Sequence, residues 1–276
     1  MKNLIIMAAG ASSRMKKTLN EVTLSSKVKE VASLEHKTLI PIDGKDNSLL
    51  FYLCCNAKNA GYKNIYILTS PENNSFHKWI EINKSSPKIK GLKFFLPIQY
   101  VPQGRQKPIG TADGIQQALD QFPELLNSKF TVCNADNLYS TSVLKLLLLH
   151  DTSLHSIIAY DRSYLKFSEE RITKFALIKL DDQDFLKDIV EKPAVEKHNS
   201  FRNSSNQLLV SMNIFSFRGA EIYPYLKDCI MNPERDEKEL PEAVRSLIKS
   251  EVKTVFAYIV KEHLKDLTSA HDINTF

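Results

Sequence analysis

The chain has 276 residues, of which 43% are apolar and 25% are charged. This composition excludes a collagen-like chain, a low-complexity chain and a small disulfide-built protein, and it predicts a globular α/β protein. The net charge of +5 comes from acids and bases mixed along the chain, without the clustered basic stripe that a dedicated nucleic-acid binder would carry.

No apolar run approaches the roughly 18 residues that a membrane helix needs. The N-terminal run Met1–Ala11 resembles a short secretory signal, but basic residues from Arg14 to Lys17 follow at once, which favours a buried first strand. The cysteines contain no C-x-x-C pair, and they are Cys54, Cys55, Cys133 and Cys229. We therefore expect reduced, mostly buried thiols in a cytoplasmic protein that binds neither membrane nor nucleic acid.

Strands alternate with helices in the first half of the chain. Apolar runs predict strands over Leu4–Met7, Ile65–Thr69, Lys93–Val101, Phe130–Cys133 and Ser156–Tyr160. Helices are predicted over Leu50–Ala60, where Gly61 would be the C-cap, and over Ala112–Phe122 and Ser142–His150. This order predicts a doubly wound, mostly parallel, Rossmann-like sheet that binds ligands at the carboxyl ends of its strands.

The second half is less regular and predicts a smaller mixed lobe. Strands are expected over Phe175–Leu180, Leu186–Val190, Leu208–Phe217 and Val252–Val260, and helices over Ala220–Cys229 and Leu240–Lys249. Two polar segments, Lys16–His36 and Glu196–Asn206, are expected to be insertions or mobile loops, although Ser25–Leu34 is compatible with a helix.

A turn of small residues follows the first predicted strand. It consists of Ala8, Ala9, Gly10, Ala11, Ser12 and Ser13, and Arg14 comes next. Main-chain N–H groups in such a turn can approach phosphate oxygens, and serine hydroxyls and an arginine fork add donors. An ordinary tight turn explains the stretch equally well, because it is neither a Walker loop nor a dinucleotide fingerprint.

A second loop leads from a predicted strand into a helix. Its Gln103 could contact a base edge, and Gly110 would let the main chain lie against a flat ring. The alternative is that Thr111 simply caps a helix. Before this loop, Lys37 precedes the apolar run that Pro41 closes, and taken alone it is typical of solvated surface.

Several polar residues lie where predicted elements end or begin. Asp136 follows a strand, where one carboxylate could hold Mg²⁺, although an Asp-Asn turn is the simpler interpretation. Glu191 and Lys192 end a strand and would face opposite ways unless Pro193 bends the chain. Asn213 interrupts an alternating strand and Glu242 begins a helix; for both, surface structure is the alternative.

Together these segments resemble, in order, the motifs of the sugar-1-phosphate nucleotidyltransferase family, which includes glucose-1-phosphate thymidylyl- and uridylyltransferases. The matching segments are Ala9–Arg14, Lys37–Ile42, Gly110–Ala112, Ala135–Asn137, Glu191–Pro193, Leu240–Glu242 and the tail Asp266–Asp272. The resemblance covers nearly the whole chain. It implies the nucleotide-diphospho-sugar transferase type of fold, as a single domain with a nucleotide-binding half at 1–150 and a sugar-phosphate-binding half at 151–276.

The resemblance also implies roles for individual residues. Arg14 and the loop from Ala8 to Ser13 would hold the NTP triphosphate, and Lys37 would neutralise phosphate charge. Gln103, Gly110 and Thr111 would lie at the base. Asp136 and Glu242 would bind Mg²⁺, the cofactor that the family implies. Glu191 and Asn213 would contact the sugar, and Lys192 would bind its phosphate. The reaction implied joins an NTP and a sugar 1-phosphate to give an NDP-sugar and pyrophosphate.

Two alternatives stay open. The sequence Ala-Ala-Gly-x-Ser-Ser-Arg-Met also resembles a motif of cytidylyltransferases that act on alcohol phosphates. A non-catalytic nucleotide or sugar-phosphate sensor of the same fold is the other alternative, and the joint presence of Arg14, Asp136, Lys192 and Glu242 argues against it. The base, the acceptor and the oligomeric state are left undetermined by the sequence.

Overall fold

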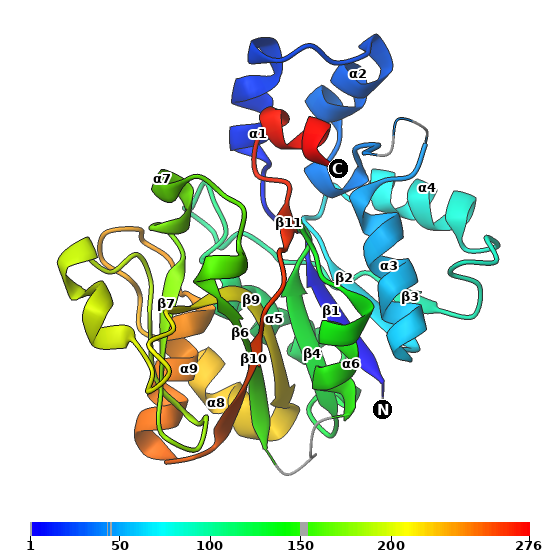
Figure 1. Cartoon of the computed structure of the whole chain (residues 1–276). Coiled ribbons are helices and arrows are strands. Elements are labelled where there is room, and N and C mark those ends of the chain that lie inside the picture. The colour runs from blue at the N-terminus through cyan, green and yellow to red at the C-terminus, as the bar shows by residue number, and fades with distance from the viewer. Residues whose placement is uncertain (1, 43, 45, 150–153) are drawn as a thin grey trace.

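The computed structural model describes residues 2–42, 44, 46–149 and 154–276. Within these residues a sheet of nine strands lies at the centre of the molecule (Figure 1). Seven strands follow the order β10-β6-β9-β4-β1-β2-β3, and β7 joins β9 to β8. The strands of this sheet are β1 (Asn3–Met7), β2 (Asn64–Leu68), β3 (Lys93–Phe95), β4 (Lys129–Asn134), β6 (His155–Asp161), β7 (Ala176–Leu180), β8 (Leu186–Val190), β9 (Leu209–Arg218) and β10 (Val255–Val260).

The sheet is largely parallel, as predicted. β1 runs parallel to both β2 and β4, β2 to β3, and β6 to β10. β9 interrupts this pattern, because it lies antiparallel between β4 and β6. β7 and β8 form an antiparallel hairpin beside β9, which gives the second half its mixed character. A strand from the second half therefore completes the sheet begun by the first half.

Helices cover both faces of the sheet, as a doubly wound fold requires (Figure 1). The α-helices are α1 (Ser13–Thr18), α2 (Ser26–Leu34), α3 (Leu49–Ala60), α4 (Asn74–Asn83), α5 (Thr111–Gln121), α6 (Thr141–Leu149), α7 (Glu169–Ile172), α8 (Gly219–Lys227) and α9 (Leu240–Ser250). α3, α4 and α6 pack on one face, and α5, α8 and α9 on the other. In β1, Leu4 and Ile6 face the first group while Ile5 faces the second, as the alternation of a strand dictates.

The segment Lys16–His36, expected to be an insertion or a mobile loop, is folded, and it contains a helix where Ser25–Leu34 was compatible with one. It folds into α1, the 3₁₀ turn Leu19–Glu21 and α2, for which Ser25 is the N-cap. These elements share a separate apolar cluster with the C-terminal 3₁₀ helix Ala270–Thr275, in which Met15 and Leu19 meet Ile273. We call residues 15–36 together with 270–275 the cap. Figure 1 shows the red C-terminal segment rising from β10 to reach it.

A short antiparallel ladder joins this C-terminal segment to the loop after β4. Its strands are β5 (Asn137–Leu138) and β11 (Lys265–Asp266), and Asp266 lies opposite Asn137. The segment therefore passes directly beside the carboxyl end of a central strand, where sheets of this kind bind their ligands.

Three predicted elements differ from the structure in detail. The strand expected over Lys93–Val101 ends at Phe95, because Pro97 cannot donate to a ladder and only Ile98 bridges to Thr69. Glu196–Asn206 is not simply exposed, since a 3₁₀ helix over Val195–Phe201 buries His198 and Phe201. The helix expected over Ser142–His150 is α6, and His150 lies outside the described residues.

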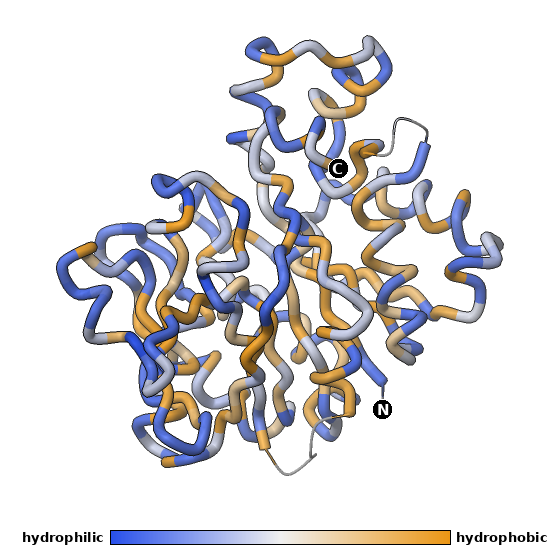
Figure 2. Tube along the Cα trace, in the orientation of Figure 1, coloured by the Kyte–Doolittle hydropathy of each residue, from blue (hydrophilic) through white to orange (hydrophobic). Residues whose placement is uncertain are grey.

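The apolar residues gather in the strands and the helix faces, whereas the outer loops are mostly hydrophilic (Figure 2). All four cysteines are buried and unpaired, as expected. Among the described residues, no helix is both long and apolar enough to cross a membrane.

Candidate active site

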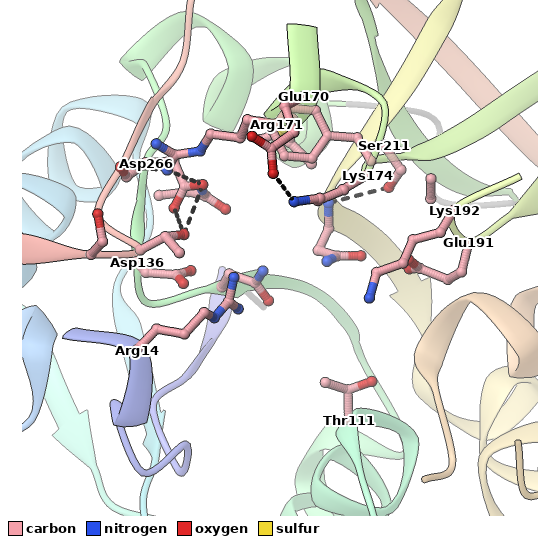
Figure 3. Close-up of a pocket in the computed structure, with 18 of the residues that line it drawn as sticks. Arg14, Thr111, Asp136, Glu170, Arg171, Lys174, Glu191, Lys192, Ser211 and Asp266 are labelled. Carbon is pink, nitrogen blue, oxygen red and sulfur yellow. Dashed lines mark hydrogen bonds and ion pairs between the residues drawn. The ribbon is translucent and has the colours of Figure 1, made fainter. Parts of the chain in front are cut away.

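A cleft of about 1190 Å³ opens at the carboxyl ends of β1, β4 and β8. It brings together six of the predicted site residues from distant parts of the chain, namely Arg14, Thr111, Asp136, Glu191, Lys192 and Asn213. Figure 3 shows Arg14 and Asp136 on one side of the cleft and Glu191 and Lys192 on the other. The cleft therefore has two ends, which segments from distant parts of the chain supply.

The small-residue turn after β1 is fastened to the segment that contains Lys37. Ser12 has a left-handed φ of 55°, and its Oγ accepts a hydrogen bond from the Lys37 main-chain N at 3.1 Å. Burial, together with the charge of Lys37, lowers the pKa of the neighbouring His36 to about 4, so the ring is neutral near pH 7. The loop from Ala8 to Ser13 thus has a fixed shape and leads directly into α1, where Arg14 lies.

The side chain of Arg14 extends into the cleft, and its guanidinium makes no hydrogen bond or ion pair with any described residue (Figure 3). A guanidinium that is exposed and uncommitted can take a phosphate group in a bidentate manner. Its position next to the small-residue loop supports the predicted phosphate-binding role of this end of the cleft.

Lys37 meets Asp136 despite the folded cap that separates it from Arg14 in sequence. Its Nζ lies 2.5 Å from Asp136 Oδ2, and the two side chains are 14% and 20% exposed. The adjacent Thr38 hydroxyl donates to the Ala135 carbonyl at 2.8 Å, which fixes the two segments against each other. Lys37, predicted to neutralise phosphate charge, and Asp136, predicted to bind Mg²⁺, therefore lie in contact.

Asp266 is the acid that lies beside Asp136. The β5–β11 ladder places it there, and the Leu267 N–H donates to the Asp136 carbonyl at 2.7 Å. Burial raises the pKa of Asp266, and the negative charge of Asp136 raises it further. Two neighbouring carboxylates with mutual repulsion, one buried and one partly exposed, attract a cation.

The structure does not place Glu242, the predicted second metal ligand, beside this acid pair. Its neighbour Pro241 lines the cleft, but one helical residue further turns by about 100°, and Glu242 leaves the cleft wall. Its carboxylate instead accepts a hydrogen bond from Arg245 at 3.0 Å. The tail segment Asp266–Asp272 matches a family motif, but the resemblance indicated Glu242, at the start of α9, as the second Mg²⁺ ligand.

The donor set fits Mg²⁺. This ion is typically bound by one or two carboxylates together with phosphate oxygens and water. Asp136 and Asp266 supply two carboxylates beside the phosphate-binding loop. No group of three or more His, Cys, Asp and Glu suited to a metal occurs in the part of the chain that the structure describes. A metal held here would therefore depend on substrate oxygens for its remaining ligands.

Glu191 and Lys192 both face the cleft because the chain bends between them. Lys192 has a left-handed φ of 42° and Pro193 follows, so the two side chains do not diverge as they would in an extended strand. Neither side chain has a hydrogen bond or ion pair with a described residue. Burial raises the pKa of Glu191 to about 7, and nearby Glu239 adds to the shift. This end of the cleft thus offers one free ammonium and one free carboxyl group.

Asn213 reaches the cleft through an irregularity of β9. The pairing of β9 with β6 shifts register between Ile157 and Ala159, and Asn213 has a left-handed φ of 54°. Its N–H donates to Ser211 Oγ at 3.2 Å. Such a bulge redirects side chains that would otherwise alternate between the two faces of the sheet.

The predicted base-binding loop is held against the segment before α9. Gly110 has a φ of 140°, and a Cβ atom there would lie 2.4 Å from the Lys238 carbonyl oxygen. Thr111 Oγ1 accepts a hydrogen bond from the Leu240 N–H at 2.8 Å, so Thr111 joins α5 to α9 rather than capping α5. Gln103 is exposed at a turn and is absent from the described cleft lining; its contact with a base stays a prediction.

The cleft lining also includes charged residues that the sequence did not indicate, among them Arg171, Lys174 and Arg235. Arg235 forms an ion pair with Glu239, and Lys174 pairs with Glu170 at 2.7 Å. These three come from polar stretches without a recognisable motif. Gln99 was also missed; it is buried and donates to the Gly110 carbonyl at 2.8 Å, which stabilises the glycine turn.

The chain matches the nucleotidyl transferase family over residues 4–263. It is 24% identical over 264 residues to a glucose-1-phosphate adenylyltransferase of Paramagnetospirillum magneticum, in a match that covers 94% of this chain and 59% of that protein. A solved structure of a UDP-glucose pyrophosphorylase complexed with UDP-glucose has the same fold. It matches with a TM-score of 0.71 and 19% identity, over 100% of this chain and 96% of that one. Since the family match spans most of its length, the chain belongs to the nucleotidyl transferase family.

Proposed function

We propose that the protein joins an NTP and a sugar 1-phosphate to give an NDP-sugar and pyrophosphate, with Mg²⁺ bound by Asp136 and Asp266. One observation carries this proposal. The acid pair and the uncommitted Arg14 lie on one side of a single cleft, and the uncommitted Lys192 lies on the other side. Two phosphorylated molecules can therefore meet there, each with its own cation.

In the proposed reaction, an oxygen of the acceptor phosphate attacks the α-phosphorus of the NTP. The new P–O bond forms as the bond to the bridging oxygen of pyrophosphate breaks. No general base is required, because the attacking phosphate is already ionised. Catalysis then consists of positioning and of neutralising charge in the transition state.

Each end of the cleft has a part in this reaction. Arg14 and the loop from Ala8 to Ser13 bind the triphosphate, and Lys37 adds a positive charge beside Asp136. Bound Mg²⁺ would supply charge neutralisation at the phosphate oxygens. Lys192 binds the acceptor phosphate. Glu191 and Asn213 offer hydrogen-bonding groups to the sugar hydroxyls.

The acceptor class is supported by the lining of the cleft and by the names of the relatives. Both named relatives act on glucose derivatives. A cytidylyltransferase that acts on phosphocholine would need aromatic rings around the quaternary ammonium. Among the described residues that line the cleft, Phe175 is the only Phe, Tyr or Trp. A sugar with hydroxyl groups suits Glu191 and Asn213 better.

The test is pyrophosphate release with Mg²⁺ across a grid of nucleotides and acceptors. Four ribonucleoside triphosphates and dTTP are each combined with several sugar 1-phosphates and with phosphocholine, and Asp136→Asn serves as the blank. Turnover with a sugar 1-phosphate supports the proposal and identifies base and sugar together. Turnover with phosphocholine alone supports the cytidylyltransferase alternative. Nucleotide binding by calorimetry without turnover in any combination would favour a sensor.

A further inference from the structure

Arg171 bridges two carboxylates of the C-terminal segment. Its Nη2 donates to Asp266 Oδ2 at 2.8 Å and to the Asp266 carbonyl at 3.1 Å, while Nη1 donates to Asp272 Oδ1 at 2.5 Å. The side chains of Asp266 and Asp272 are 9% and 10% exposed. The guanidinium also lies 4.7 Å from the centre of the Phe167 ring, which supports it from a further side.

Asp272 organises the turn that leads into the cap. Its carboxylate accepts hydrogen bonds from the main-chain N–H groups of Thr268 at 2.9 Å and Ser269 at 2.7 Å. With Ser269 it forms a capping box at the start of the C-terminal 3₁₀ helix. Arg171 therefore holds an acid of the proposed metal site and the acid that shapes the following turn.

The same segment supports the helix that contains Arg14. The Ala270 N–H donates to Thr18 Oγ1 at 2.9 Å, and Thr18 Oγ1 in turn donates to the Arg14 carbonyl at 3.0 Å. An unbroken series of contacts thus runs from Arg171, in the second half of the chain, through the C-terminal segment to Arg14. Figure 3 shows Arg171 and Arg14 on opposite sides of the acid pair.

We propose that Arg171 is a positioning residue with two effects. It fixes Asp266 beside Asp136, and through the C-terminal segment it anchors α1, the helix that contains Arg14. The consequence of Arg171 for catalysis rests on the proposed function, in which Arg14 binds the triphosphate. The physical reason is charge. Two carboxylates that lie side by side repel each other. Lys37 pairs with Asp136, and Arg171 pairs with Asp266, so each acid has its own cationic side chain.

Arginine suits this task better than lysine. A guanidinium is planar and presents several N–H groups in a fixed fork, so it can contact two carboxylates and a carbonyl at once. A lysine ammonium has a single nitrogen at its tip and cannot span the same acceptors. Replacement of Arg171 by lysine is therefore expected to keep the charge but to lose the bridge between Asp266 and Asp272.

The first readout is hydrogen exchange at the main-chain amides of residues 267–270, each of which has a partner in the structure. We expect Arg171→Met to accelerate this exchange and Arg171→Lys to have an intermediate effect. Arg162→Met is the matched control. Arg162 forms an ion pair with Glu169, which lies in α7 together with Arg171, but Arg162 does not line the cleft that contains the acid pair. Exchange at 267–270 should therefore stay as in the wild type. Unchanged exchange in Arg171→Met would overturn the proposal.

The second readout is the affinity for Mn²⁺ with pyrophosphate, measured by calorimetry, because this probe needs no knowledge of the base or the sugar. Loss of a residue that orients a metal ligand typically weakens metal binding by roughly 10–100-fold. We expect a loss of this size in Arg171→Met and a smaller one in Asp272→Asn, which keeps the contact between Arg171 and Asp266. A lower melting temperature with unchanged affinity would reduce Arg171 to a structural residue and overturn the proposal.

The two readouts separate this inference from the proposed function. Hydrogen exchange reports on the C-terminal segment whether or not the protein turns over a substrate. A wild-type protein that neither binds Mn²⁺ with pyrophosphate nor releases pyrophosphate would contradict the proposed function. Accelerated exchange in Arg171→Met would still support the role of Arg171 in holding the segment.

Discussion

Lys37 forms an ion pair of 2.5 Å with Asp136, which lines the cleft, although residues 15–36 of the cap lie between Arg14 and Lys37 in the sequence. The two ends of this segment meet in the structure, because Ser12 accepts a hydrogen bond from the main chain of Lys37. Closing a segment of this length costs little free energy, since loop-closure entropy grows slowly with length.

Replacement of Asp136 by asparagine tests the metal assignment. The variant keeps the size of the side chain but loses the charge that faces Lys37 and the proposed Mg²⁺. We expect a loss of turnover on the order of 100-fold or more, as for the removal of one group that stabilises transition-state charge. The measurement is Mg²⁺-dependent pyrophosphate release, with circular dichroism melting as the control for folding. Full activity in a folded variant would remove Asp136 from the metal site.

The second acid can be identified by a pair of variants. We expect Asp266→Asn to reduce turnover and to raise the Mg²⁺ concentration needed for half-maximal rate by about tenfold or more. Glu242→Gln should keep most of the turnover, because Glu242 pairs with Arg245 away from the cleft. Magnesium titrations of both variants decide between them. The opposite ranking would restore Glu242 as the ligand.

Sequence reasoning found the sheet and most of the site because these depend on local patterns. Leu4–Met7 is apolar enough to be a buried strand, and Asp136 follows such a strand directly. Arg171 and Asp266 could not be paired in this way, because their contact depends on how the tail crosses the cleft. The direction of the Glu242 side chain was not predictable for a related reason: within the first turn of a helix, this direction depends on which neighbour is buried.

Lys192→Ala tests the acceptor end of the cleft. The uncommitted ammonium of Lys192 is proposed to bind the acceptor phosphate, whereas Arg14 binds the NTP. We expect the KM for the acceptor to rise by roughly tenfold, as for the loss of a charged hydrogen bond, with a much smaller change in the KM for the NTP. Steady-state kinetics with each substrate varied in turn provide the comparison. An unchanged acceptor KM would exclude Lys192 from this contact.

Glu191 predicts a pH dependence of stability. Its pKa is raised from an ordinary 4.5 to about 7 by burial, so the folded protein binds more protons than the unfolded chain between these values. Folding stability should therefore fall as pH rises through this window. Glu191→Gln removes the contribution and should be more stable than the wild type at pH 8, by up to about 3 kcal/mol. At pH 4, where the carboxyl is protonated in both states, the two proteins should be nearly equal.

Urea unfolding of both proteins at pH 4, 6 and 8 measures this difference. The same variant should also bind the acceptor less well, because a fixed amide replaces a carboxyl group that faces the sugar. A stability difference that is the same at every pH would show that Glu191 is ordinary in the folded protein.

Gly110→Ala tests whether the glycine turn and the segment before α9 form one unit. A Cβ atom at residue 110 would lie 2.4 Å from the Lys238 carbonyl oxygen and 2.8 Å from its nitrogen, and both are main-chain atoms that cannot move aside alone. The Lys238 N–H donates to the Ile109 carbonyl at 2.7 Å, and the Ala112 N–H donates back to the Lys238 carbonyl at 3.0 Å. The added methyl group would separate these two bonds.

The expected cost of this substitution is about 1–3 kcal/mol of stability, from backbone strain and overpacking. Because Thr111 also accepts from Leu240, loosening the junction should move Thr111 in the cleft wall and weaken NTP binding. Gly104→Ala is a useful comparison, since it also has a positive φ but no atom lies within 4 Å of the added Cβ. An alanine at either position is strained because the φ angle is positive. A larger loss of NTP affinity in Gly110→Ala than in Gly104→Ala would therefore be due to the contact with Lys238. Equal affinities would mean that the junction does not shape the nucleotide end of the cleft.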